Sequence, residues 1–347
     1  MTDTPDLGRR ALIAGIPLLA VPFALRAQAV SDPINDHMTG YITSLHDPVM
    51  IKEGDTWHVF GSGGWEKGSL MTWRTSKDLL VWSDNGPVFA ALPDWTHMIV
   101  GGNSCWAPDI SFYNGEFRLY YAVSTGGSMR SAIGLATSKT LDKGSKDYGW
   151  QDRGLVLETH PGDGCNAIDP NFVVDYDGKT WLAFGSYWTG LKLIALDPAT
   201  GKPFDGDKTL HSLAYRPAPD GGDNAIEGAF VYKHGGYYYL FASYDHCCQG
   251  MQSNYYVACG RSKVVTGPYI DRDGKWMMDG YGTSVVYDRP YRSHRFIGPG
   301  HCGLAKDGDR DLLVYHAYDT QHEARPTLRI SPLIWDKDGW PGVVTDA

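Results

Sequence analysis

The sequence predicts an all-β fold, a β-propeller, and three observations support this prediction. Five segments share a short apolar stretch, a glycine-containing turn and an aromatic-rich stretch, a pattern typical of a β-hairpin. The 42 glycines and 20 prolines suit short strands joined by turns. No long stretch has the apolar periodicity of a helix. Repeated hairpins without helices indicate a radial array of antiparallel sheets.

The five candidate hairpins follow one another along most of the chain. In order they are HDPVMIKEGDTWHVFGSG (46–63), APDISFYNGEFRLYYAVS (107–124), IDPNFVVDYDGKTWLAFGS (168–186), IEGAFVYKHGGYYYLFASY (226–244) and GHCGLAKDGDRDLLVYHAY (300–318). Their turns carry Gly54, Gly115, Gly178, Gly235 and Gly308. Each segment supplies two strands, and the residues between segments supply the outer strands and loops of a blade. Five repeats therefore predict five blades.

Aligned on their starts, the hairpins place a polar residue at an equivalent position in every repeat. These residues are Asp47, Asp109, Asp169, Glu227 and His301. They lie roughly 60 to 75 residues apart, which fits a four-stranded blade with long loops. Residues at the mouth of each innermost strand converge on the axis of a propeller. The alignment therefore predicts four carboxylates and a histidine at the centre of the molecule.

The first 29 residues have the pattern of an export signal. Arg9 and Arg10 precede an apolar run over residues 11–25, and Ala27-Gln28-Ala29 is a small-x-small cleavage site. The paired arginines resemble a twin-arginine signal, with Sec export as the alternative. We therefore expect residues 1–29 to be removed and residues 30–347 to form one domain, periplasmic or secreted.

The charge of the chain disfavours two classes of partner. The net charge is −9 at pH 7, whereas nucleic acids and anionic membranes attract basic surfaces. We therefore expect no nucleic acid and no membrane partner, and a neutral substrate suits this surface better. No low-complexity linker separates the repeats, so we expect a single domain. We also expect this domain to be a monomer.

Export would place the six cysteines where disulfides persist. Two pairings are open, Cys105 with Cys165 across adjacent repeats and a strained vicinal disulfide between Cys247 and Cys248. The remaining two, Cys259 and Cys302, have no partner that the sequence identifies. A zinc site is not expected, because the spacings match no finger or ribbon.

The acidic residues of the repeats are the candidates for catalysis. Cleavage of a glycosidic bond needs one carboxylic acid to protonate the leaving oxygen and one carboxylate to activate water or attack the sugar. Crowded carboxylates have separated pKa values, because like charges close together cannot all ionise. The pattern favours this role for Asp47, Asp169 and Glu227. For Asp109 it favours a structural role, capping local backbone at a strand start.

Further motifs occur in order along the chain. They are HDP from His46, WAPD from Trp106, NAIDPN from Asn166, SYWTGLKL from Ser186, NAIEG from Asn224, CCQG from Cys247, GRSKVVTGPY from Gly260 and GPGHCG from Gly298. Together they resemble the α-L-arabinanases of glycoside hydrolase family 43, of the endo-1,5-α-L-arabinanase type. The resemblance implies a five-bladed β-propeller, an active site at the central axis and an inverting mechanism.

The resemblance also implies roles for individual residues. Asp47 would be the general base, Glu227 the general acid, and Asp169 the residue that raises the pKa of the acid and orients it. His301 would lie at the axis beside a bound ion, usually calcium held largely through water. One imidazole alone makes a poor site for a hard cation, so a structural role for His301 stays open.

Five further residues are candidates for substrate binding. Trp106, Tyr187 and Trp188 flank axis-facing strands, and sugars stack their apolar faces on such rings. Asn166 and Ser186 can form hydrogen bonds with sugar hydroxyls. The alternatives are core packing for the aromatic residues and local turn hydrogen bonds for the polar ones.

The favoured function is hydrolysis of α-1,5-linked arabinan within the chain by an exported enzyme. An exo-acting α-L-arabinofuranosidase, or an enzyme that releases arabino-oligosaccharides, would keep the three acids and differ in its loops. A non-catalytic sugar-binding propeller would keep the aromatic residues without needing three carboxylates. A metal-dependent hydrolase is a further alternative, with Asp47, Asp169, Glu227 and His301 as ligands.

Overall fold

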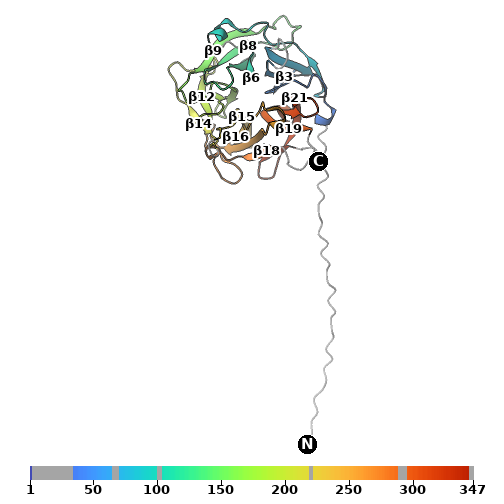
Figure 1. Cartoon of the computed structure of the whole chain (residues 1–347), viewed down its shortest axis with the longest axis vertical. Coiled ribbons are helices and arrows are strands. Elements are labelled where there is room, and N and C mark those ends of the chain that lie inside the picture. The colour runs from blue at the N-terminus through green and yellow to red at the C-terminus, as the bar shows by residue number, and fades with distance from the viewer. Residues whose placement is uncertain (2–33, 65–69, 100–103, 219–221, 288–294, 344–347) are drawn as a thin grey trace.

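The protein is a ring of five antiparallel sheets, as Figure 1 shows. The computed structural model describes residue 1 and residues 34–64, 70–99, 104–218, 222–287 and 295–343. The chain colours in Figure 1 pass once around the ring, so each blade is a contiguous piece of sequence. The predicted all-β, five-bladed propeller is confirmed. The predicted export signal lies outside the described residues.

Each blade begins at the axis and ends at the rim. Blade 1 contains β2 (Val49–Glu53), β3 (Thr56–Ser62), β4 (Met71–Ser76) and β5 (Val81–Asp84), and its sheet also carries β1 (Thr39–Gly40). Blade 2 contains β6 (Trp106–Tyr113), β7 (Glu116–Val123), β8 (Ser131–Ser138) and β9 (Gln151–Thr159). Blade 3 contains β10 (Asn171–Val174), β11 (Thr180–Phe184), β12 (Leu191–Asp197), β13 (Lys202–Pro203) and β14 (His211–Ala214). Blade 4 contains β15 (Ile226–His234), β16 (Tyr237–Tyr244), β17 (Tyr256–Ser262) and β18 (Thr283–Val286). Blade 5 contains β19 (Phe296–Asp307), β20 (Arg310–Asp319), β21 (Arg325–Trp335) and β22 (Pro341–Val343).

The helical elements whose bounds the structure describes are short 3₁₀ helices. They are η1 (Asn35–His37), η2 (Asp94–Met98), η4 (Gly250–Gln252) and η5 (Met277–Asp279). Within the described part of the chain, no helix is long and apolar enough to cross a membrane.

The predicted turn glycines join the first two strands of each blade. Gly54, Gly115, Gly178, Gly235 and Gly308 all have positive φ, from 55° to 82°. A Cβ atom built on any of them would meet nothing within 4 Å. Backbone conformation, and not lack of space, therefore favours glycine at these turns.

The core lies between the blades. Each of five hydrophobic clusters joins two neighbouring blades, as where Phe60 and Trp73 of blade 1 pack with Tyr121 of blade 2. Strands are consequently covered on both faces, and β8 is buried along its whole length. This two-sided burial explains why the second strands are runs of aromatic and apolar residues instead of alternating patterns.

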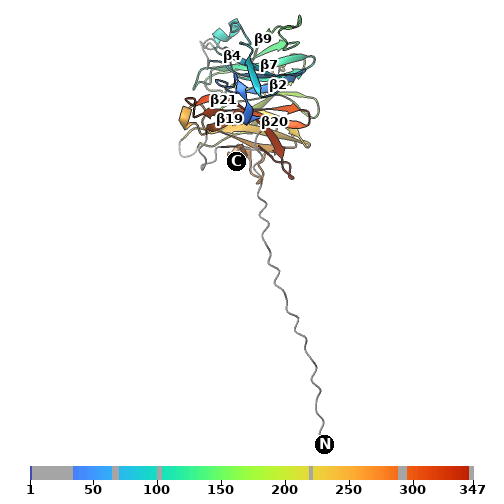
Figure 2. The same ribbon diagram turned by 90° about the vertical axis from the view of Figure 1, so that its right-hand side faces the viewer.

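The ring is closed where blade 5 meets blade 1. Figures 1 and 2 both show the red strands of blade 5 beside the blue strands of blade 1. The segment before blade 1 spans this junction, because β1 pairs with β5 while Asn35 Oδ1 accepts a hydrogen bond of 2.8 Å from Ile330 N in β21. Leu328 N of β21 also donates to Ile42 O. Backbone pairing with both blades fixes the two ends of the repeat array together.

All six cysteines are free thiols in this structure. Cys105 packs in the cluster between blades 1 and 2, and Cys165 in the cluster between blades 2 and 3. The two are therefore not paired.

Candidate active site

One backbone feature recurs just before the inner strand, or in its first half, in every blade. Asp47, Ala107, Asp169, Gly228 and His301 have φ between 38° and 63°. The inner ladder shifts register beside this position in blades 2, 4 and 5. A local bulge re-aims the neighbouring side chains at the mouth of each strand. In blade 2 the equivalent of Asp47 is thus Ala107, and in blade 4 Glu227 lies one residue before the equivalent position.

Asp109 is therefore not one of the residues at the mouth of the strands. Its Oδ2 accepts a hydrogen bond of 2.8 Å from Phe172 N, and its Oδ1 accepts one of 3.1 Å from Asn171 Nδ2. One blade further on, Asn171 Oδ1 accepts from Val231 N at 2.8 Å. These side chains join successive inner strands. The prediction of four converging carboxylates was wrong, because three converge. In blade 2 the position equivalent to Asp47 is Ala107, two residues before the acidic residue Asp109.

Asp47 lies among three imidazoles. Its Oδ2 is 2.8 Å from His46 Nδ1, and its Oδ1 is 3.3 Å from His301 Nδ1 and 3.8 Å from His316 Nδ1. Ser62 Oγ also donates to Oδ2. Burial alone would raise the pKa of Asp47, but the charges of His46 and His301 outweigh it and hold this pKa well below its usual range. The carboxylate is thus kept ionised.

His46 carries the compensating charge. Burial would lower the pKa of His46, yet the ion pair and hydrogen bond with Asp47 raise it to about 10. His316 is fully buried, and burial together with the charge of His46 lowers its pKa well below the usual value. His316 is consequently neutral, and its Nδ1 accepts a hydrogen bond of 3.2 Å from Asp47 N.

Glu227 is held by two hydroxyl groups. Ser186 Oγ donates to Oε2 and Tyr255 Oη donates to Oε1, both at 2.8 Å. Tyr255 lies against Gly300, where a Cβ atom would come within 1.9 Å of the tyrosine ring. The half-buried carboxyl group is therefore fixed in orientation by blades 3 and 4, and Gly300 makes room for one of its donors.

Asp169 is buried beside Glu227. Its Oδ2 accepts a hydrogen bond of 3.0 Å from Gly228 N, the residue after Glu227. Burial raises the pKa of Asp169 well above its ordinary value, and the charges of Glu227 and Asp47 raise it further. Three carboxyl groups thus occupy three different environments, which is the arrangement that separates a base from an acid.

Side chains near the ends of the second strands of blades 1, 4 and 5 bind a backbone N–H of the next blade, which the sequence did not reveal. Ser62 Oγ accepts from Ala107 N, and Ser243 Oγ accepts from His301 N, both at 2.8 Å and both from the next blade. His316 takes the same position in blade 5 and accepts from Asp47 N. The signal was present in the segment ends FGSG, FASY and YHAY, but its meaning depends on which blade lies alongside.

The predicted substrate-binding residues differ in their exposure to solvent and in their hydrogen bonds. Tyr187 and Trp188 are half-buried in the loop after β11, both with positive φ, beside Ser186. Trp106 is half-buried at the start of β6, and its Nε1 donates to Ser104 Oγ. Asn166 is buried and accepts a hydrogen bond of 2.6 Å from Ser131 Oγ. Thus the three aromatic candidates are partly exposed, while Asn166 and Ser186 already form hydrogen bonds within the protein.

Two groups of described residues could hold a metal ion. Ligand atoms of His46, Asp47 and His316 lie within 4.8 Å of one another, as do those of His46, Cys247 and Cys248. His301 belongs to neither group, but it contacts Asp47 and retains some exposure to solvent.

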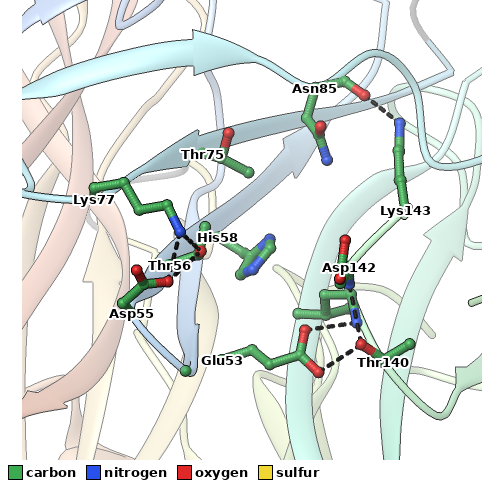
Figure 3. Close-up of a pocket in the computed structure, with 12 residues that line it drawn as sticks. Glu53, Asp55, Thr56, His58, Thr75, Lys77, Asn85, Thr140, Asp142 and Lys143 are labelled. Atoms are coloured by element: carbon green, nitrogen blue, oxygen red, sulfur yellow. Dashed lines mark hydrogen bonds and ion pairs between the residues drawn. The ribbon is translucent and has the colours of Figure 1, made fainter. Parts of the chain in front are cut away.

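A pocket of about 560 Å³ lies elsewhere, at the opposite end of the inner strand β2. Figure 3 shows the side chains that line it, drawn from the β2–β3 turn, from β4 and from the loop after β8. Glu53 accepts hydrogen bonds from Thr140 Oγ1 and Leu141 N, and Lys77 pairs with Asp55. The contacts of Glu53 join blades 1 and 2. The three carboxyl groups described above lie away from this pocket.

Comparisons with known proteins agree with this architecture. The profile of glycosyl hydrolases family 43 matches residues 41–341. The chain is 42% identical over 299 residues to the extracellular endo-α-(1→5)-L-arabinanase 1 of Bacillus subtilis, covering 86% of this chain and 87% of that protein. It is 39% identical over 308 residues to the extracellular exo-α-(1→5)-L-arabinofuranosidase ArbA of Cellvibrio japonicus, covering 86% of both. A Cellvibrio cellulosa α-L-arabinanase solved with arabinohexaose superimposes with a TM-score of 0.80 at 38% identity, covering 87% of this chain and 96% of that one. This protein, a five-bladed propeller with three carboxyl groups at the mouths of its inner strands, therefore belongs to glycosyl hydrolases family 43.

Proposed function

We propose that this protein is an exported, inverting endo-1,5-α-L-arabinanase that hydrolyses arabinan. The single observation that carries the proposal is the division of three carboxyl groups into an ionised one, a buried one with a raised pKa, and one oriented by two hydroxyls. A sugar-binding protein has no need of such a division. The relatives named as arabinanases give the substrate class.

The three carboxyl groups divide the reaction between them. Asp47, ionised beside His46, accepts a proton from a water molecule as its oxygen attacks the anomeric carbon. Glu227, oriented by Ser186 and Tyr255, gives its proton to the leaving glycosidic oxygen. Asp169 acts through Glu227 as a positioning residue, because two neighbouring carboxyl groups that repel one another when both are ionised hold one proton between them. Attack from the face opposite the leaving group inverts the anomeric configuration.

The substrate site would use the half-buried aromatic residues near these acids. Tyr187 and Trp188 lie beside Ser186, a donor to Glu227, so a sugar stacked on them would be close to the acid. Trp106 begins the inner strand of blade 2, which is the neighbour of the blade that supplies Asp47. Ser186 serves the acid directly, and Asn166 supports the loop before Asp169.

An ion beside His301 is part of the proposal. His301 supplies one nitrogen, whereas Ca²⁺ takes six to eight oxygen ligands, so water would supply most of the ligands of an ion at this position. Bound calcium would offset the repulsion among three neighbouring carboxyl groups. Asp47 Oδ1 and His301 Nδ1 are 3.3 Å apart, and these two side chains would orient the water ligands of the ion.

Export and cleavage after residue 29 complete the proposal, with residues 30–347 acting as one catalytic domain and as a monomer. The relatives from Bacillus subtilis and Cellvibrio japonicus are both named extracellular enzymes. Mass determination of the amino terminus of protein recovered from outside the cytoplasm tests this part.

A time course of products on linear arabinan tests the activity. Early long oligomers that shorten with time are expected of endo action. One small product from the outset would instead favour the exo-acting alternative, which the exo-acting Cellvibrio japonicus relative supports. Proton NMR of the first sugar released should show the β-anomer, and initial α-anomer would contradict the inverting mechanism.

A further inference from the structure

Cys247 and Cys248 form an accessible dithiol beside the catalytic carboxylate. Their Sγ atoms are 2.8 Å apart, and Cys248 is exposed while Cys247 is half-buried. The other four cysteines are all buried. Among the six thiols, this pair is the one that solvent reaches, and its two sulfur atoms are in direct contact.

The pair is connected to Asp47 by a short chain of polar contacts. Cys248 N donates a hydrogen bond of 2.8 Å to Tyr318 Oη, and Tyr318 Oη lies 3.1 Å from His46 Nε2. The other ring nitrogen, His46 Nδ1, is 2.8 Å from Asp47 Oδ2. The imidazole of His46 is thus held between the dithiol loop and the carboxylate that accepts the proton.

The thiol of Cys248 also contacts this imidazole directly. Its Sγ is 3.5 Å from His46 Nε2 and 3.9 Å from Tyr318 Oη. In the dithiol form, His46 Nε2 therefore has two competing partners, the sulfur and the tyrosine hydroxyl. Conversion of this sulfur to a disulfide removes the thiolate charge that competes with the Tyr318 hydroxyl for this nitrogen.

We propose that Cys247 and Cys248 form a reversible vicinal disulfide that positions His46, and through it Asp47, so that the oxidised enzyme is the more active form. The inference rests on the proposed function in one respect, the role of Asp47 as general base. It adds a thiol–disulfide control of that base. Both cysteines are positioning residues, because they act through His46 and do not touch the reacting atoms.

The oxidation needs an acceptor disulfide, either a small molecule or a thiol–disulfide oxidoreductase. The thiolate of Cys248 attacks one sulfur of the acceptor, and the other acceptor sulfur leaves as a thiolate. Cys247, deprotonated, then attacks the Cys248 sulfur of the mixed disulfide and releases the second acceptor thiolate. One intramolecular S–S bond forms, the acceptor S–S bond breaks, and two electrons and two protons pass to the acceptor. The contact with Cys247 lowers the pKa of Cys248 to about 5, which suits it as the first nucleophile.

The test compares the full protein after treatment with oxidised glutathione and after treatment with dithiothreitol. Intact mass and peptide mapping report whether the Cys247–Cys248 bond forms, with loss of two hydrogens. Steady-state kinetics on linear arabino-oligosaccharides should show a kcat about fivefold lower in the reduced form, the effect of one misplaced hydrogen bond, with KM unchanged. The ¹⁵N signals of the His46 ring should differ between the two forms.

Two variants make the comparison specific. Cys248→Ser should have the same kcat under both treatments, since no vicinal bond can form. Cys165→Ala, which changes a buried thiol in the core between blades 2 and 3, should keep the full response.

Four outcomes overturn the inference. They are absence of the Cys247–Cys248 bond after oxidation, equal kcat and unchanged His46 signals in the two forms, a change confined to KM, and higher activity in the reduced form. If neither form hydrolyses arabinan, the proposed function fails instead. The mass and His46 measurements still decide in that case whether the pair controls the imidazole.

Discussion

At the scale of single residues, identical carboxyl groups acquire different chemistry from their neighbours. Asp47 is surrounded by imidazoles that stabilise its charge, whereas Asp169 is buried against other carboxylates that oppose its ionisation. Glu227 receives one hydroxyl donor on each oxygen. Substitutions that keep shape and remove charge should therefore have distinct effects at each position.

Glu227→Gln should lose activity on arabinan and retain it on substrates with a good leaving group. The amide cannot donate a proton to the departing oxygen, so hydrolysis of arabinan should slow by about 10²–10⁴-fold. An aryl arabinofuranoside with an acidic phenol barely needs this proton. The comparison uses kcat on both substrates, with Asp47→Asn as the control that should fail on both. Equal loss for Glu227→Gln on the two substrates would reject its role as the acid.

Asp169→Asn should move the basic limb of the pH profile to lower pH. Two carboxyl groups that repel one another lose their protons in two separated steps, and the proposed reaction needs the singly protonated pair. Without the charge of Asp169, the remaining proton is lost at lower pH. The profile of kcat/KM against pH measures this shift, and an unchanged basic limb would mean that Asp169 has another task.

At the scale of elements, the inner strands are fastened to one another by side chains that accept backbone N–H groups of the next blade. Asp109 and Asn171 do this along the strands, and Ser62, Ser243 and His316 do it at their mouths. Backbone N–H groups need such partners because the strands of different blades do not share a ladder. The register of each blade relative to the next is therefore set by buried polar contacts as well as by packing.

Asp109→Ala should destabilise the protein without removing activity. It leaves the buried N–H of Phe172 without its acceptor, which costs about 1–3 kcal/mol. Urea unfolding measures the loss, and kcat of the folded fraction should stay close to that of the parent. Asp177→Ala, at an exposed turn position in blade 3, is the matched control and should change stability by less than about 0.5 kcal/mol. Loss of activity at unchanged stability would place Asp109 in the active site after all.

At the scale of the whole molecule, the ring brings together residues that are far apart in sequence. Asp47 meets His301 and His316 only because blade 5 closes against blade 1. The same closure sets Tyr318 beside His46. Anything that loosens the junction of these blades should therefore affect Asp47 and the stability of the ring together.

Removal of the proposed ion should lower activity and thermal stability together. Without a cation, three neighbouring carboxyl groups repel one another with less compensation, so the midpoint of thermal unfolding should fall and the pH optimum should shift. Chelation and His301→Ala should have similar effects, while exposed His97→Ala should have none. The product should still be the β-anomer. Full activity and an unchanged pH profile in protein shown by elemental analysis to be metal-free would make the ion dispensable.

The sequence by itself determined the hairpins, their turns, the number of blades and the identity of Asp47, Asp169 and Glu227 as the acids of interest. These features depend on local backbone preference and on a pattern repeated along the chain, both of which are written in the order of residues. Only the tertiary structure decided that Ala107 and not Asp109 is the counterpart of Asp47, that Ser186 and Tyr255 orient Glu227, and that the dithiol of Cys247 and Cys248 faces His46. These contacts join different blades, and their partners follow from bulges and ring closure, which shift register by one or two residues without changing the apolar pattern.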